Sequence, residues 1–452
     1  MHDTPQRRAP RQAASLALRF ALAAGVAITA APAWGEPLTL DQAVERARAA
    51  NPTVRAARLD ALGAGARTSQ AWARHLGDLD LVGSASRYEG ARLVKPITGP
   101  LSPAVTAALP FDRDQLHYGA TWQLPLFAGG ALVQGDRSAG AAERAADHQA
   151  ERTLQEIGYA VRTTYRAVLG LGHALVAAEG YERALTKDEA SARLKVETEA
   201  WSGADGAKVQ YALASARARR SALAAQRRTA LAQLAALLGD DPGTAEYELG
   251  DLPAAPAEPP AGLTTSAAAA LDQRPDLRAA REGSEAQRLR GSAVRGGFWP
   301  QLAFVGNYTF NDAPSVGTPY RTWEVGLVVK IPLLADVGRA AAVREADAAA
   351  EAAAERERAK IREVGSQVID AIGRLEAARA AFEAGTAQRR LGVEVARVEK
   401  LRFEAGTGRI EDYLTARAQE LEGETSYWQG LYGLQAAHDN LDLATGRGGS
   451  HE

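Results

Sequence analysis

Four segments of the chain alternate between apolar and polar residues with the period of two that is typical of β-strands. They lie at about residues 79–88, 116–126, 301–311 and 322–333. In the last of them an aromatic or aliphatic residue occupies every second position from Trp323. Each segment is about 10 residues long, which suits either a half-buried strand of a soluble domain or a tilted strand that crosses a bilayer. The pattern predicts two β-hairpins.

Two long segments without proline follow these hairpins, at residues 126–241 and 333–452. Alanine, glutamate, arginine and leucine predominate in them, and all four are good helix formers. Apolar positions recur at intervals of three, four and seven residues, as in coiled coils and helical bundles. Glycines within Ser202–Gly206 and Ala405–Gly408 divide the segments, and we expect them to supply the positive φ of a helix–helix turn. Each segment is predicted to form one helix of about 70 residues and a returning helix of about 35.

Several motifs occur twice in the same order. "NPTVRAAR" (Asn51–Arg58) corresponds to "RPDLRAAR" (Arg274–Arg281), and "GAKVQYALA" (Gly206–Ala214) corresponds to "GRIEDYLTA" (Gly408–Ala416). Conserved order with a slowly drifting offset is what an old duplication leaves. We predict two structural repeats, each with a helix, a β-hairpin, a long helix and a returning helix.

A Pro-Leu pair stands near the end of one predicted strand in each repeat, at Pro125-Leu126 and Pro332-Leu333. Proline has no N–H to offer to a strand ladder, so it fits a strand end. We predict that these four residues mark the seams where a strand ends and the chain turns into a long helix.

The N-terminus resembles a secretory signal peptide. Arginines precede a short apolar stretch, Phe20–Ala31, and the small residues Ala31 and Ala33 flank a proline. This pattern predicts export and cleavage after Ala33. Because the chain contains no cysteine, we do not expect acylation as a lipoprotein.

The expected organisation follows from these boundaries. We predict a signal peptide at 1–33, a first repeat at 34–239, a proline-rich linker at 240–263, a second repeat at 264–446 and a C-terminal tail at 447–452.

The membrane interpretation rests on the strands. No run of about 20 apolar residues follows the signal peptide, so strands of a β-barrel are the expected way into a bilayer. Four strands are too few, because the smallest barrels have about eight. We therefore predict a homotrimer in outer-membrane lipid. The expected fold class is a mixed α/β membrane protein, in which long helical hairpins form an α-barrel and three chains share a twelve-stranded β-barrel.

Other chemistry is sparse in the sequence. The formal net charge is −2, which gives no basic footprint for nucleic acid. The seven histidines have no metal-ligand spacing. Neither a phosphate-binding glycine loop nor a G-x-S-x-G nucleophile motif occurs. We expect no enzyme activity, no cofactor, no metal site and no nucleic-acid partner.

Taken together, these motifs resemble the TolC-like outer-membrane efflux protein family, over essentially the whole mature chain. Besides the repeated motifs, three further stretches carry the resemblance: "LTLDQAVERARAANP" (Leu38–Pro52), "FWPQLAFVGNY" (Phe298–Tyr308) and "RFEAGTGRIEDYLTARAQELEGETSYW" (Arg402–Trp428). The resemblance implies the outer-membrane factor of a tripartite efflux pump or type I secretion system in a Gram-negative bacterium.

In that family the trimer is an exit duct that crosses the outer membrane and extends into the periplasm. The resemblance therefore implies two partners: a periplasmic adaptor (membrane fusion) protein and an inner-membrane pump of RND or ABC type. Drugs, metal ions and a secreted protein all remain possible cargoes. The alternatives are a trimeric coiled-coil surface scaffold or adhesin without conductance, and a periplasmic adaptor. The duplicated seams and hairpins count against both.

The resemblance also implies a site at the helix-turn-helix tips, which form the periplasmic entrance in the family. Two acidic residues that ring its constriction correspond to Asp412 and Thr415, with Glu411 adjacent. Since Thr415 is not acidic, at most one such ring is retained. Three carboxylates on an axis would favour cations, whereas the simpler interpretation of Asp412 is a carboxylate stabilised at a helix N-terminus.

The closed-state latch of the family is altered in this sequence. A family aromatic residue that hydrogen-bonds across the entrance corresponds to Phe403, which has no hydroxyl, and its acidic partner corresponds to Lys208. We hypothesise that Lys208 pairs with Glu411 or Asp412 instead, and Arg409 is a further gate candidate. The glycines of the tips are expected to shape turns that dock the adaptor: Gly203, Gly206, Gly406 and Gly408.

Overall fold

The computed structural model describes most of the chain from residue 37 onward. The described residues are 37–95, 97, 102–103, 108–243, 247–252, 272–332 and 337–447. The predicted signal peptide, much of the predicted linker, Leu333 and nearly all of the predicted tail lie outside them. The described residues from Leu38 onward belong to one compact unit.

Both halves have the same order of elements. The first half contains α1 (Leu40–Ala50), α2 (Pro52–Ala73), the short 3₁₀ helix η1 (Arg74–Leu76), β1 (Asp78–Leu93), β2 (Phe111–Ala128), α4 (Ala131–Glu197) and α5 (Gly203–Leu238). The second contains α7 (Pro275–Gly296), β3 (Gln301–Asp312), β4 (Tyr320–Lys330), α8 (Val337–Glu404) and α9 (Ile410–Thr445). The long helices have 67 and 68 residues and the returning helices have 36 each, close to the predicted lengths.

The four strands form one antiparallel sheet in the order β1-β2-β3-β4. The two predicted hairpins are joined because β2 pairs with β3, with Trp122 opposite Gly306. Strands β1 and β4 are the edges, and neither has a second neighbour among the described residues. The apolar positions of the alternating pattern are largely uncovered: Leu81 is 90% exposed and Trp323 is 72% exposed. The sheet therefore has two open edges and an apolar face that the chain itself does not bury.

One predicted seam is placed differently in the structure. Pro125 lies inside β2, which continues to Ala128, and the pairing register with β3 shifts between Pro125 and Phe127. A bulge leaves one residue out of the ladder, so proline is tolerated there without ending the strand. The prediction that Pro125 ends the strand is therefore wrong by three residues. Pro332 does follow the end of β4 at Lys330.

The turn from β2 into α4 uses two glycines in the left-handed region. Gly129 has φ 63° and Gly130 has φ 80°. A Cβ on Gly129 would also lie 2.1 Å from the carbonyl oxygen of Gly296. Glycine is required there by both the backbone conformation and the close approach of the end of α7.

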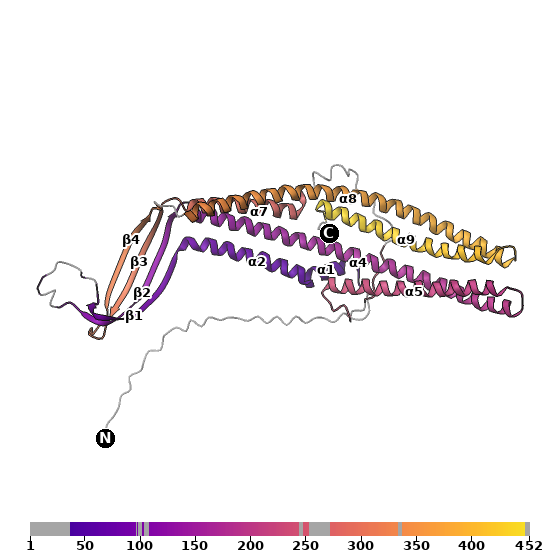
Figure 1. Cartoon of the computed structure of the whole chain (residues 1–452), viewed down its shortest axis with the longest axis horizontal. Coiled ribbons are helices and arrows are strands. Elements are labelled where there is room, and N and C mark those ends of the chain that lie inside the picture. Colours follow the sequence, from indigo (N-terminus) through magenta and orange to yellow (C-terminus); the bar gives the residue numbers. More distant parts are fainter. Residues whose placement is uncertain are drawn as a thin grey trace, which may run out of the picture. The chain divides into compact units, whose positions relative to one another are not determined.

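Helix α4 is the central element of the helical part. It packs against α2 and α7 along one stretch and against α5 and α9 along another, and α8 packs against α7 and then α9. The sheet lies at one end of these helices, and the α4–α5 and α8–α9 turns lie at the other (Figure 1). None of the described helices is long and apolar enough to cross a membrane.

The two X-Pro motifs play matching structural roles. Asn51, just before Pro52, donates from Nδ2 to the carbonyl of Leu237 in the last turn of α5 (2.9 Å). Arg274, just before Pro275, donates from Nη1 to the carbonyl of Ala444 in the last turn of α9 (3.2 Å). Carbonyls at a helix C-terminus lack partners within the helix. In each half, therefore, the residue before the proline satisfies the end of the returning helix.

Candidate functional site at the helix-hairpin tips

The first tip turn joins α4 to α5 through Thr198–Ser202. Contrary to the sequence prediction, its positive φ belongs to Glu199 (58°) and not to a glycine. Gly203 is already the first residue of α5, and Gly206 lies within the first turn of that helix. Ser202 caps the helix, because its Oγ accepts a hydrogen bond from the N–H of Asp205 (3.2 Å). A good cap allows the helix to start at Gly203 without help from a left-handed glycine.

The second tip turn joins α8 to α9 and does follow the glycine prediction. Gly406 has φ 76°, and its N–H bonds to the carbonyl of Phe403 (3.0 Å). A Cβ on Gly408 would lie 3.0 Å from both the Cβ of Arg402 and the backbone nitrogen of Phe403. Gly406 therefore provides the left-handed conformation, and Gly408 provides the room for the chain to turn tightly.

An ion pair connects the two tips. Lys208 Nζ on α5 lies 2.6 Å from Glu411 Oε1 on α9 and 3.0 Å from Asp205 Oδ1. The hydrogen bond from Lys208 lowers the pKa of Glu411, and the hydrogen bond to Glu411 raises the pKa of Lys208. Arg409 Nε is 3.4 Å from Glu411 Oε2. The contact hypothesised for Lys208 is thus present, and its partner is Glu411 rather than Asp412.

The three residues predicted for the constriction point in different directions. Glu411 and Thr415 line a groove beside Lys208, whereas Asp412 does not. Asp412 is exposed, and its carboxylate has no ion-pair partner within the described part of the chain. Adjacent residues of a helix point about 100° apart, so Glu411 turns toward α5 while Asp412 turns away. Asp412 is therefore the carboxylate free to contribute to a ring, and this role remains a prediction.

Aromatic residues pack the two tips together. Phe403 stacks on Tyr413, with ring centroids 5.2 Å apart, and meets the edge of Trp201 at 5.5 Å. Lys195 Nζ lies 4.5 Å from the centre of the Trp201 ring. Trp201 and Lys195 belong to the first hairpin, and Phe403 and Tyr413 to the second. Aromatic stacking and cation–π contacts each add about 0.5–1.5 kcal/mol, so this cluster holds the tips to one another.

Tyr413 supplies the hydroxyl that Phe403 lacks. Its OH donates to Asp188 Oδ2 on α4 at 2.9 Å, again from one hairpin to the other. Burial raises the pKa of Tyr413, and the hydrogen bond to Asp188 raises it further. Sequence reasoning did not identify Trp201, Tyr413 or Asp188. Tyr413 lies two residues from Glu411, within a motif already singled out, so its aromatic hydroxyl was the available signal.

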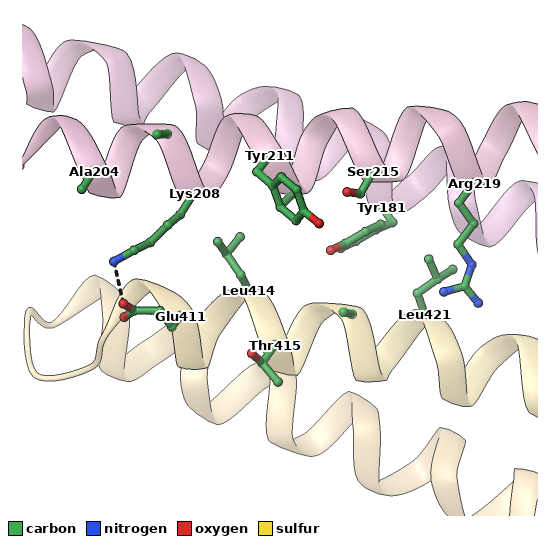
Figure 2. Close-up of a pocket in the computed structure, with 14 residues that line it drawn as sticks. Tyr181, Ala204, Lys208, Tyr211, Ser215, Arg219, Glu411, Leu414, Thr415 and Leu421 are labelled. Atoms are coloured by element: carbon green, nitrogen blue, oxygen red, sulfur yellow. Dashed lines mark hydrogen bonds and ion pairs between the residues drawn. The ribbon is translucent and has the colours of Figure 1, made fainter.

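A groove extends from the Lys208–Glu411 pair between α5 and α9 (Figure 2). Its volume is about 870 Å³. Among the described residues, no cluster of three or more histidine, aspartate or glutamate side chains is placed to hold a metal ion.

The fold and the tips define a class of protein: a chain with a lipid-compatible open sheet at one end and paired helical hairpins at the other. Residues 267–447 match the model of the family described as Outer membrane efflux protein. The chain belongs to the TolC-like outer-membrane efflux protein family.

Solved structures with this fold are similar along most of their length. The outer-membrane channel OprN is 19% identical, with 90% of this chain and 89% of that chain covered and a TM-score of 0.77. The CmeC outer membrane channel of Campylobacter jejuni is 17% identical (90% and 86% covered, TM-score 0.78). The open state of the MtrE outer membrane channel of Neisseria gonorrhoeae is 18% identical (90% and 89% covered, TM-score 0.72). No curated protein matches the chain.

Proposed function

We propose that three copies of this chain form a channel through the outer membrane of a Gram-negative bacterium. The channel is the exit duct of a tripartite efflux pump or type I secretion system. It conducts its cargo passively, and an inner-membrane pump of RND or ABC type supplies the energy through a periplasmic adaptor protein. Drugs, metal ions and a secreted protein remain the candidate cargoes.

The observation that carries this proposal is the exposed apolar face of an open sheet. Leu327 and Val329 on β4 are 65% and 60% exposed, and Leu79 on β1 is 73% exposed. Monomeric soluble proteins rarely leave so large an apolar patch in water. Lipid is the solvent in which this face is stable, while polar residues of the other face, such as Asn307 and His117, suit an aqueous lumen.

The open edges of the sheet support closure between copies. Unpaired strand edges are not tolerated in hydrocarbon, so β4 of one copy is expected to pair with β1 of the next. This contact uses different surfaces on the two partners, and such a head-to-tail contact forms a ring when the rotation closes. Three copies supply twelve strands, which is above the minimum of about eight.

The helix-hairpin tips are proposed to form the periplasmic entrance. Asp412 is the candidate for a ring of carboxylates at the constriction, and the Lys208–Glu411 pair is the candidate latch. The turns around Gly406 and Gly408 are candidates for adaptor docking. Support comes from the family resemblance and from the position of the tips opposite the sheet (Figure 1).

Crosslinking tests the proposed closure, because the chain has no native cysteine. The double variant Ser84→Cys/Thr322→Cys places one thiol on β1 and one on β4. Treatment of outer-membrane fractions with a short bismaleimide should convert it to covalent trimers on denaturing gels. Each single variant is the matched control and should yield no trimer.

Conductance in planar lipid bilayers tests the duct itself. The purified trimer should carry ion current, whereas a coiled-coil scaffold would reach the cell surface and carry none. A monomer that stays in the periplasm without detergent would contradict both the trimer and the duct.

A further inference from the structure

The groove between α5 and α9 has the shape of a seat for one helix. Its α5 wall is a single helical face, formed by residues that recur every three or four positions: Ala204, Lys208, Tyr211, Ser215 and Arg219. Its α9 wall includes Glu411, Leu414, Thr415, Ala418 and Leu421, and Tyr181 of α4 lies between the walls (Figure 2). The groove is closed at the tip end by the Lys208–Glu411 pair.

The chemistry of the lining favours a protein helix as the occupant. Alanines at 204, 207, 212, 216 and 418 leave room for a backbone to come close, as ridges-into-grooves packing requires. Tyr211 is 77% exposed on one wall, although a large aromatic side chain contributes most when it is covered. A small polar solute would leave this apolar lining wet.

The two walls carry opposite charge. Helix α5 contains six lysines and arginines against one aspartate, whereas α9 contains seven acidic residues against one arginine. On α5, Arg217 and Arg220 share Glu182 as an ion-pair partner. Arg219, which lines the groove, has no ion-pair partner within the described residues. The α5 rim therefore offers an uncompensated positive charge to whatever occupies the groove.

From this geometry we propose that the groove binds one amphipathic helix of a periplasmic partner, with the acidic edge of that helix against α5. The apolar stripe of the partner covers Tyr211 and Leu414, and its carboxylates reach Arg219. Reversing the direction of a helix in a groove exchanges its two edges. The charge difference between the walls thus selects one direction of the incoming helix. This inference rests on the proposed function for the existence of such a partner.

A second copy of the chain is the other candidate occupant, and the layout disfavours it. The surfaces left open for a neighbouring copy are the edges of the layer, at β1 and β4 in the sheet. The groove lies instead within one chain, between helices of its two halves. A neighbour that pairs strand to strand does not thereby enter it.

The probes for the test are two synthetic, fluorescently labelled helical peptides of equal composition and with the same apolar stripe. One has all glutamates on one edge and all lysines on the other, and the second has both charges mixed on both edges. Binding to the full-length protein in detergent is followed by fluorescence anisotropy at low salt. We expect at least tenfold tighter binding of the edge-separated peptide, and at least a tenfold loss of that binding in Arg219→Glu.

Arg228→Glu is the matched control. Arg228 is exposed on the same helix nine residues further on, which places it about 180° around α5 from Arg219, and its reversal should change binding less than twofold. Equal binding of the two peptides, or equal effects of the two reversals, would overturn the inference. So would a photo-crosslinker at position 211 that attaches only to another copy of the chain.

Bilayer conductance of the same variants separates this inference from the proposed function. Arg219→Glu should conduct like the unmodified protein, because the groove is assigned to partner binding. A protein that conducts but shows no preference between the peptides retains the duct and loses the groove assignment. A protein that prefers the edge-separated peptide but carries no current does the reverse.

Discussion

Replacing Asp276 by asparagine should destabilise the junction at which the second half of the chain closes on itself. Asp276 is in the first turn of α7 and is only 8% exposed. Both of its oxygens accept hydrogen bonds from Arg274, at 2.9 and 2.6 Å. Arg274 is 0% exposed, and it also donates to the last turn of α9. The substitution leaves this guanidinium buried without its counter-ion.

The magnitude follows from the pKa of the carboxyl group. Burial alone raises the pKa of Asp276, but the hydrogen bonds and charge of Arg274, with Arg152 and Lys360 nearby, outweigh burial and lower it from 3.8 to about 2. At about 1.36 kcal/mol per tenfold change, the ionised carboxylate contributes about 2.4 kcal/mol to folding. Removing one member of a buried pair costs about 3–5 kcal/mol, because the stranded Arg274 adds its own penalty.

The assay is urea unfolding of the detergent-solubilised protein, followed by circular dichroism at fixed protein concentration. Asp272→Asn is the matched control: Asp272 is 83% exposed and lies 3.5 Å from Arg281, so its loss should cost less than about 1 kcal/mol. The pair replacement Arg274→Met/Asp276→Leu should recover most of the stability lost in Asp276→Asn, since no charge is then left buried.

The pH dependence gives a second, independent check. Because the folded pKa of Asp276 is depressed, its contribution is fully present above about pH 4 and is lost as pH falls toward 2. The stability difference between the unmodified protein and Asp276→Asn should therefore shrink across that window. Equal costs for Asp276→Asn and Asp272→Asn at neutral pH would refute the reasoning.

Three further predictions concern the tips. Lys208→Glu should raise single-channel conductance by opposing Glu411, and Lys208→Glu/Glu411→Lys should restore it, whereas unchanged conductance in the single variant would contradict a latch. Tyr413→Phe keeps the ring and loses the bond to α4, so it should speed proteolysis at the tips severalfold without affecting trimer formation. Gly408→Ala should also speed tip proteolysis, because its Cβ meets backbone at 3.0 Å, whereas Gly203→Ala, which meets nothing within 4 Å, should match the unmodified protein.

The fold was accessible from the sequence because its signals are periodic and long. Segments of over a hundred residues without proline left little alternative to helices, and glycines marked where they reverse. The strands were found from alternation, but their ends were not: β1 and β2 extend beyond the predicted 79–88 and 116–126 on both sides. Alternation ends where side chains stop facing lipid or lumen, whereas backbone pairing continues into the outer loops.

The site was accessible only in part, because its contacts join residues more than 200 positions apart. Lys208 and Glu411 were paired by considering what replaces a missing latch, and charge sufficed for that. The stacking of Trp201 on Phe403 depends on how the two tips are placed in space, which no local pattern specifies. Glu199 shows the same limit for the backbone: a good cap at Ser202 made the expected glycine unnecessary.

The tip contacts together imply how the proposed entrance opens. Val209 on α5 and Ile410 on α9 are buried in the same cluster, beside the ion pair that spans the same two helices. Moving α9 away from α5 would break the ion pair and uncover both side chains. A disulfide in Val209→Cys/Ile410→Cys should therefore hold the entrance closed, and bilayer current should fall on oxidation and recover on reduction. The single-cysteine variants should show no redox dependence. If the oxidised double variant conducts as well as the reduced one, the two hairpins open as one body, and the Lys208–Glu411 pair is not the latch.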